Sequence, residues 1–173
     1  MKWTTLFAAT SLAAFSASVL ANETVTMHKI DEKGLGEIIG TIQLADTAQG
    51  LKISPSLKGL APGQHGFHVH ENGACDAKEK DGKMVVGLAA GGHFDPNKVG
   101  KHEGPMGHGH MGDLPALQVA PDGSATQVMT AEHLTLADLK GRSIMIHEGG
   151  DNYADQPKPL GGGGSRIACG VIK

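Results

Sequence analysis

The sequence predicts an all-β fold, built as a sandwich or a barrel. The chain of 173 residues contains 26 glycines and 8 prolines, a composition typical of short strands joined by many turns. Its apolar residues show little helical periodicity. Short segments instead alternate apolar with polar residues or are rich in β-branched residues, as strands are. Eight such segments suit a sandwich or a barrel.

The predicted strands follow one another along the chain and are separated by turn residues. Residues 135–140 are expected to form about one helical turn, which is too short to change the class. The eight predicted strands are residues 24–30, 37–44, 51–57, 66–70, 116–119, 125–130, 143–147 and 167–171.

Two long segments show no strand pattern and are predicted to be functional loops. Residues 71–115 are rich in Gly, His, Asp and Lys, and residues 148–165 include four consecutive glycines from Gly161. A structureless loop as long as the first is uncommon in a compact domain unless a disulfide or a metal orders it. We therefore expect these loops to carry the functional residues.

Residues 1–21 are predicted to be a secretory signal peptide. Lys2 gives a positive start, residues 6–20 are apolar or small, and Val19-Leu20-Ala21 offers a cleavage site. Cleavage there leaves residues 22–173, or 173 minus 21, which is 152 residues and suits one domain. No later segment is long and apolar enough to span a bilayer, so no stable membrane association is expected.

Charge and cysteine content limit the possible partners and the compartment. Without Lys2 the chain has 14 basic and 18 acidic side chains, a net charge of about -4 with neutral histidines. With no basic block, nucleic acid is not an expected partner. The two cysteines, Cys75 and Cys169, are expected to form a disulfide in an oxidising compartment.

The histidines give the strongest chemical signal. The chain has 10 histidines, and most of them lie between His65 and His110. On a strand, His68 and His70 share one face while Phe67 and Val69 point to the core, so two imidazoles are available to one transition metal. His147, which ends the predicted strand 143–147, is a candidate third ligand from a neighbouring strand.

Further candidate ligands lie in the first long loop. His93 is flanked by glycines and a turn, which allow close backbone approach. A Gly-rich segment then carries His102, His108, His110 and Asp113, and three imidazoles with one carboxylate satisfy tetrahedral zinc. A set of four histidines favours copper, and a set with a carboxylate favours zinc.

Taken in order, several segments resemble copper-zinc superoxide dismutase, in particular its bacterial periplasmic branch. The resemblance covers essentially all of residues 22–173 and includes both cysteines and Arg166. The matching segments are GFHVHE at 66–71, GGHFDP at 91–96, residues 102–113, MIHE at 145–148 and GGSRIACGVI at 163–172.

The resemblance implies an eight-stranded Greek-key β-barrel that binds one copper and one zinc ion per subunit. The implied copper ligands are His68, His70, His93 and His147, and the implied zinc ligands are His93, His102, His110 and Asp113. His93 would then bridge the two metals as an imidazolate. Such a ring must lose the proton that a neutral histidine keeps.

The resemblance also implies the reaction and its supporting residues. Two superoxide radicals and two protons would give O2 and hydrogen peroxide in the periplasm, by alternate reduction and reoxidation of copper, with His93 supplying a proton. Arg166 matches an arginine that attracts and orients the anion. Asp151 matches an aspartate that orients one imidazole of each metal set, and Cys75 and Cys169 match the family disulfide. The expected assembly is a monomer or a homodimer.

Several polar residues stay outside the predicted site. His110 is chosen over His108 because it precedes Asp113 by three residues, as the family spacing requires. His65 is expected to make a structural hydrogen bond, and His28 and His133 to be surface residues. Lys78, Lys80 and Lys83 either extend a positive field for an anionic substrate or form an ordinary solvated run.

Three other functions would use parts of the same residue pattern. A copper carrier or metal store would need neither Arg166 nor a bridging His93. A zinc hydrolase would need only three ligands and an open position, but the sequence has no nucleophile elbow and no histidine-glutamate zinc-protease motif. A β-sandwich adhesion module would not need the ordered ligand set.

Overall fold

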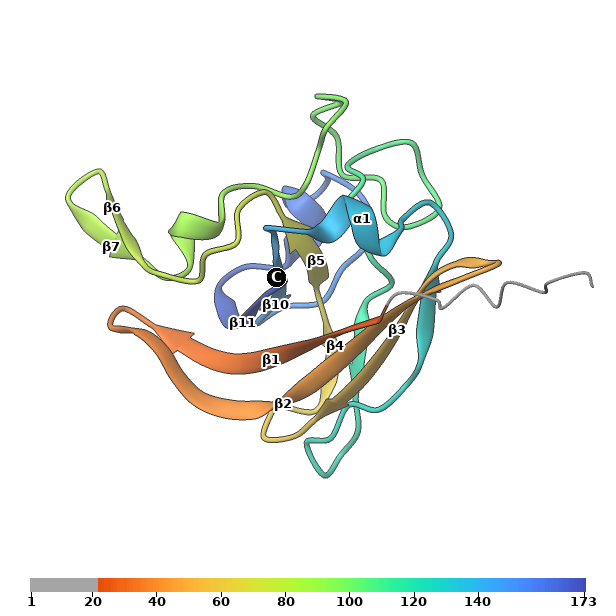
Figure 1. The fold of residues 1–173 in the computed structure, drawn as a ribbon. Coiled ribbons are helices and arrows are strands. Elements are labelled where there is room, and N and C mark those ends of the chain that lie inside the picture. Colours follow the sequence, from red (N-terminus) through yellow and green to blue (C-terminus); the bar gives the residue numbers. More distant parts are fainter. Residues whose placement is uncertain (1–21) are drawn as a thin grey trace, which may run out of the picture.

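The structure is a computed structural model and describes residues 22–173 (Figure 1). The predicted signal peptide lies outside the described residues. The predicted all-β class is confirmed. The helical segments are short: η1 (Leu88–Ala90), α1 (Leu136–Leu139) and η2 (Leu160–Gly162). The strands are β1 (Asn22–Asp31), β2 (Gly34–Thr47), β3 (Gly50–Leu57), β4 (Gly63–His65), β5 (Phe67–His70), β6 (Lys78–Lys80), β7 (Lys83–Val85), β8 (Leu117–Val119), β9 (Met129–Ala131), β10 (Ser143–His147) and β11 (Arg166–Val171).

Most strands form one antiparallel sheet that curls around the core (Figure 1). Its order is β5-β10-β11-β1-β2-β3-β9, while β4 pairs with β8. Only Gly66 separates β4 from β5, so the two act as one bent strand that joins β8 to the sheet. Counted in this way, the barrel formed by residues 22–173 has eight strands, the number predicted. The connections from β3 to β4 and from β9 to β10 cross between strands that are not neighbours, as in Greek-key barrels.

Period-two alternation builds the core. Leu51 and Ile53 of β3 are fully buried and Leu57 is 2% exposed, so these residues form the core face of the strand. Phe67 and Val69 of β5 belong to the same core cluster. The strand that carries His68 and His70 is therefore fixed in register, because a slip of one residue would exchange its two faces.

The long loop 71–115 contains a β-hairpin that the sequence analysis missed. Strands β6 and β7 pair across a turn at Asp81 and Gly82, which have φ values of 54° and 76°, as a type I′ turn requires. All six strand residues are exposed, so burial imposes no apolar alternation on them. The hairpin projects from the rest of the molecule (Figure 1).

Other predicted boundaries are close to those observed, with one exception. Strand 143–147 matches β10, and the helical turn predicted at 135–140 is α1, capped by Thr135. The strand predicted at 125–130 is wrong for most of its length, because β9 begins only at Met129. Ala125 forms just an isolated bridge to Leu57.

Covalent and polar contacts hold the first long loop against the barrel. The predicted disulfide between Cys75 and Cys169 is confirmed and ties the loop to β11. The guanidinium of Arg142 lies 3.5 Å from the ring centroid of Phe94 and donates a hydrogen bond of 3.0 Å to the Glu71 carbonyl. Within residues 22–173, no helix has the length and apolar character needed to cross a membrane.

Candidate metal centre

Two neighbouring strands supply three of the histidines. His68 and His70 lie on β5 and are fully buried, on the face opposite Phe67 and Val69. Strand β10 pairs with β5, with Met145 opposite His68. His147 ends β10, and its N–H donates a hydrogen bond of 2.8 Å to the carbonyl of Gly66. The bend between β4 and β5 thus holds His147 next to the pair.

Backbone hydrogen bonds of the first long loop place His93 and Asp113 along the other edge of β5. The Val69 N–H donates to the Gly112 carbonyl at 2.9 Å, and the Phe94 N–H donates to the Val69 carbonyl at 2.8 Å. These contacts form isolated bridges that pair His70 with His93 and His68 with Asp113. Loop residues far from β5 in sequence are therefore placed as firmly as sheet residues.

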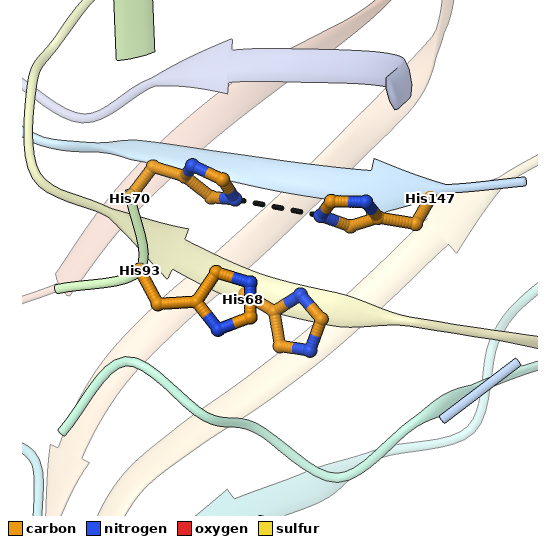
Figure 2. A group of neighbouring side chains, drawn as sticks. All are labelled: His68, His70, His93 and His147. Carbon is orange, nitrogen blue, oxygen red and sulfur yellow. Dashed lines mark hydrogen bonds between the residues drawn. The ribbon is translucent and has the colours of Figure 1, made fainter. Parts of the chain in front are cut away.

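The first group consists of His68, His70, His93 and His147, all buried (Figure 2). Each offers one ligand atom, and these atoms lie within 4.8 Å of one another. The rings of His68 and His93 stack with centroids 3.9 Å apart, and the Nε2 atoms of His70 and His147 are 3.4 Å apart.

In this group each ring has one nitrogen held by the protein and the other free to bind. His70 Nδ1 donates to the Gly91 carbonyl at 3.1 Å, and His147 Nδ1 donates to the Gly164 carbonyl at 3.3 Å. A carbonyl only accepts, so in the neutral rings Nε2 carries the lone pair. His68 Nδ1 and His93 Nε2 are buried without a hydrogen-bond partner. These four nitrogens fit a transition metal that prefers imidazole.

The second group surrounds the Asp113 carboxylate. His93 Nδ1 lies 2.9 Å from Asp113 Oδ1, and His102 Nδ1 lies 2.9 Å from Asp113 Oδ2. His110 Nδ1 is 3.5 Å from Asp113 Oδ1. The Nδ1 atoms of His102 and His110 are buried and make no hydrogen bond. Three imidazoles and a carboxylate that converge in this way fit tetrahedral zinc.

The tightest second cluster differs from the predicted zinc set in one residue. The ligand atoms that lie within 4.8 Å of one another come from His68, His93, His102 and Asp113. This cluster therefore contains His68 in place of the predicted His110. His68 Nε2, however, already donates to Asp151 Oδ2 at 2.8 Å. His110 Nδ1 has no such bond, and the assignment of His110 stays a prediction.

Asp151 lies between the two groups. One of its oxygens accepts from His68 Nε2 at 2.8 Å, and the other accepts from His102 Nε2 at 2.7 Å. Asp151 therefore orients one ring of each group and leaves both Nδ1 atoms facing inward. Metal-binding histidines commonly have such a partner.

Burial sets the protonation of the first group. It lowers the pKa of His93 to about 4 and that of His147 to about 3, and the charge of nearby His68 adds to both shifts. Burial also lowers the pKa of His70, with the charges of His93 and Arg166 in support. These rings are neutral at pH 7, the form in which imidazole binds a metal.

In the second group, contacts between charged side chains outweigh the effect of burial on the pKa values. Burial acts to lower the pKa of His102, but contacts with Asp113 and Asp151 outweigh it and raise this pKa to about 9. Burial likewise acts to raise the pKa of Asp113, but His102 and His93 hold it well below its usual range. A buried proton thus neutralises part of the negative charge that a cation would otherwise meet.

Arg166 is half-buried beside the first group and fixed by the long loop. Its guanidinium donates to the carbonyls of Gly87, at 2.5 Å, and Gly91, at 2.7 Å. The Gly91 carbonyl also accepts from His70 Nδ1, so one carbonyl orients both side chains. Arg166 lines a pocket of about 330 Å³ with Gly164 and Ser165.

Other residues lie outside these groups. His108 is exposed, and so are Lys78, Lys80 and Lys83 on the β6–β7 hairpin. The structural hydrogen bonding predicted for His65 is confirmed, since its ring lies 2.7 Å from the His147 carbonyl and 2.8 Å from that of Ala61.

Gly161, which packs against the contact between Asp151 and His102, was not among the predicted residues. It has a φ of +68°, and a Cβ there would overlap Asp151 Oδ1 and lie 2.8 Å from His102 Nε2. The run of four glycines was a visible signal, but only the packing distinguishes Gly161 from its neighbours. The carbonyls of Gly87 and Gly91 were missed as well, because backbone acceptors leave no mark in a sequence.

Comparisons with known proteins agree with this geometry. The chain is 54% identical to superoxide dismutase [Cu-Zn] 2 of Salmonella typhimurium, over 94% of this chain and 95% of that protein. The Cu/Zn superoxide dismutase structure from Brucella abortus matches with a TM-score of 0.87 and 51% identity, covering 88% of this chain and 100% of that one. The monomeric copper, zinc superoxide dismutase of Salmonella enterica matches with a TM-score of 0.80 and 56% identity, over the same shares.

The family model described as copper/zinc superoxide dismutase matches residues 38–172, a span that includes every residue of both groups. The chain therefore belongs to the copper/zinc superoxide dismutase family.

Proposed function

We propose that this chain is a superoxide dismutase that converts two superoxide radicals and two protons to O2 and hydrogen peroxide. The observation that carries the proposal is the pair of adjacent ligand sets with His93 between them. Its Nε2 faces the all-histidine set, and its Nδ1 lies 2.9 Å from the Asp113 carboxylate. A site for one ion would not need both ring nitrogens.

We assign the free ring atoms of the first group to copper and those around Asp113 to zinc. When bound, copper supplies a one-electron redox couple, whereas zinc is redox-inactive. The assigned copper ligands are His68 Nδ1, His70 Nε2, His93 Nε2 and His147 Nε2. The assigned zinc ligands are His93 Nδ1, His102 Nδ1, His110 Nδ1 and a carboxylate oxygen of Asp113.

His93 is assigned the proton chemistry. With a metal ion on each ring nitrogen the ring would be an imidazolate, and Nε2 would be the atom that takes up and releases a proton. Burial keeps the pKa of the metal-free ring near 4, so this ring is neutral at pH 7 and still carries one proton. The contact of Nδ1 with Asp113 would hold the ring in place while Nε2 gained and lost its proton.

Arg166 is assigned the capture of the substrate anion. A guanidinium has five N–H groups, and two of its nitrogens donate to the carbonyls of Gly87 and Gly91. The remaining donors are free for a small anion next to His70 and His147. Because the group is held before substrate arrives, little side-chain entropy is lost on binding.

Residues 1–21 are proposed to direct the chain to the periplasm and to be removed there, leaving 22–173 as the working domain. The disulfide between Cys75 and Cys169 suits such an oxidising compartment. The assembly is proposed to be a monomer or a homodimer, and the relative from Salmonella enterica is described as monomeric. Light scattering on purified residues 22–173 distinguishes the two.

The function is tested by a superoxide-removal assay on residues 22–173 loaded with copper and zinc. We expect one copper and one zinc per chain and a rate constant near the diffusional ceiling of about 10⁸–10⁹ M⁻¹s⁻¹. The matched control is the same protein loaded with zinc alone, which should be inactive. A fully loaded protein that does not accelerate superoxide loss would contradict the enzyme assignment and favour a metal store.

A further inference from the structure

The residues assigned to zinc differ sharply in exposure. The side chains of Asp113 and His102 are 0% exposed, and that of His93 is 1% exposed. The side chain of His110 is 10% exposed. Among these four residues, only His110 reaches the surface with part of its ring, while its Nδ1, the assigned ligand atom, is buried.

His110 forms part of the wall of a surface pocket of about 390 Å³. The same wall contains His108, Met111 and His133. Two further imidazoles thus line the opening outside the buried ligand set. Neither belongs to the proposed copper or zinc ligands, and His133 comes from the turn between β9 and α1.

The hydrogen bond of His133 fixes which of its nitrogens can bind a cation. Its Nε2 lies 3.0 Å from the carbonyl of Met111. A carbonyl oxygen only accepts, so Nε2 carries the hydrogen and the neutral ring has its lone pair on Nδ1. The same bond ties His133 to the loop that carries His110.

His108 is held on the loop near the zinc ligands. Its N–H donates to Glu103 Oε2 at 3.1 Å, and the Glu103 N–H donates to Asp113 Oδ2 at 3.3 Å. The backbone at position 108 is therefore linked through Glu103 to the carboxylate assigned to zinc, while the His108 ring remains exposed.

We propose that this pocket is the access route for zinc, and that His108 and His133 hold the incoming ion briefly before it passes to His110. The inference rests on the proposed zinc set. Imidazole nitrogens suit zinc and other borderline divalent ions and are poor ligands for calcium or magnesium. The two histidines raise the local concentration of such ions next to His110, the one assigned zinc ligand whose ring reaches the surface.

Such a route has a kinetic signature that a structural role lacks. Because an ion leaves by the path through which it enters, loss of the two histidines should slow uptake and release by the same factor. The equilibrium affinity of the buried set should stay unchanged. A residue that instead supports the buried geometry would change the affinity.

The test uses metal-free residues 22–173 and Co(II), whose visible absorption reports a tetrahedral site, followed by repetition with zinc. In the double variant with His108→Ala and His133→Gln, uptake and chelator-driven release should each slow roughly tenfold, the lower end of the gain from local ion concentration. His133→Gln keeps a donor for the Met111 carbonyl. His28→Ala, on β1 and outside the pocket, is the control and should match wild type.

The possible outcomes separate the two proposals. Unchanged uptake in the double variant, or weaker affinity with unchanged uptake, would overturn the access route while leaving the zinc site intact. Wild-type protein that takes up no ion at the buried set would overturn the zinc assignment itself, and the access route with it. Equal final occupancy in all variants would show that they fold alike.

Discussion

At the scale of single residues, the imidazole rings are fixed by whichever of their nitrogens does not face the centre of a group. His70 and His147 donate from Nδ1 to carbonyls, whereas His68 donates from Nε2 to Asp151. Ring orientation and tautomer are therefore set before any ion binds. Of these rings, only His93 has the assigned copper set at one nitrogen and the assigned zinc set at the other.

Arg166 provides the clearest prediction for catalysis. Arg166→Ala should lower the rate of superoxide removal roughly tenfold or more, because one preorganised electrostatic donor is lost. Copper and zinc content should be unchanged, since the guanidinium contacts carbonyls and faces the proposed substrate. Pulse radiolysis and metal analysis of the same samples measure both effects.

The charge-preserving variant Arg166→Lys is the control for Arg166→Ala. It should fall between wild type and alanine, because lysine keeps the charge but lacks the planar fork. The rate of wild type should also decrease as salt is raised, since screening weakens the attraction of an anion. Equal rates in wild type and Arg166→Ala would remove Arg166 from the mechanism.

The raised pKa of His102 leads to a prediction for the pH dependence of zinc affinity. Its pKa of about 9 means that the metal-free ring is protonated at pH 7, and zinc must displace that proton. Zinc affinity should therefore rise with pH between 7 and 9, by about tenfold per pH unit for one displaced proton. Competition with a chelator across this range measures it.

Copper provides the comparison for the zinc titration. Because the pKa values of His93 and His147 lie near 4 and 3, copper added alone displaces no proton from these rings above pH 7. Its affinity, corrected for the chelator's own protonation, should be nearly flat between pH 7 and 9. A flat zinc curve would mean that His102 does not carry the displaced proton.

At the scale of elements, the strand pattern predicted one part of the site and missed another. Period-two alternation placed His68 and His70 on one face of β5, and the pattern before His147 identified β10. The approach of His93 and Asp113 depends on loop backbone pairing with Val69, and no local pattern specifies such pairing. The loop pattern offered both residues as candidate ligands, but only the family resemblance assigned His93 to both metals and Asp113 to the zinc set.

The missed hairpin has a physical explanation as well. Its Asp-Gly turn is a strong hairpin signal, but β6 carries only lysine and glutamate, and Met84 and Val85 of β7 are exposed, so neither strand has a buried face. Without a buried face, alternation is absent, and the turn signal is the only remaining indication. An exposed hairpin of this kind is found by turn chemistry rather than by hydrophobic pattern.

Two neighbouring glycines in the loop between β10 and β11 allow a test of how this loop supports zinc binding. Gly161→Ala should weaken zinc retention, because the new methyl group displaces Asp151 from His102. Gly162→Ala is a matched control. Gly162 also has a positive φ, of +81°, but a Cβ there meets only Lys158, at 3.7 Å.

Both variants should lose about 1–2 kcal/mol of stability through the left-handed backbone. Only Gly161→Ala should release zinc faster to a chelator. If the two variants released zinc equally, the contact between position 161 and Asp151 would have no role in holding the metal.

At the scale of the whole molecule, the barrel is the scaffold and the two loops carry most of the chemistry. The chain has a formal net charge of -3, which opposes capture of an anion, so a positive group must be held at the site itself. Arg166 lies at the start of β11, the strand that also contains Cys169. Cys169 forms the disulfide with Cys75 of the first long loop. The disulfide therefore links the barrel, the loop carbonyls and the arginine.

The central claim is that His93 is shared by two metal ions, and the metal content of three single variants tests it directly. Copper and zinc are measured after His93→Ala, His70→Ala and His110→Ala, each exposed to both ions and then to a chelator. The account predicts that His93→Ala loses both metals, His70→Ala loses copper and keeps zinc, and His110→Ala loses zinc and keeps copper. Loss of only one metal from His93→Ala, or full retention of zinc by His110→Ala, would contradict it.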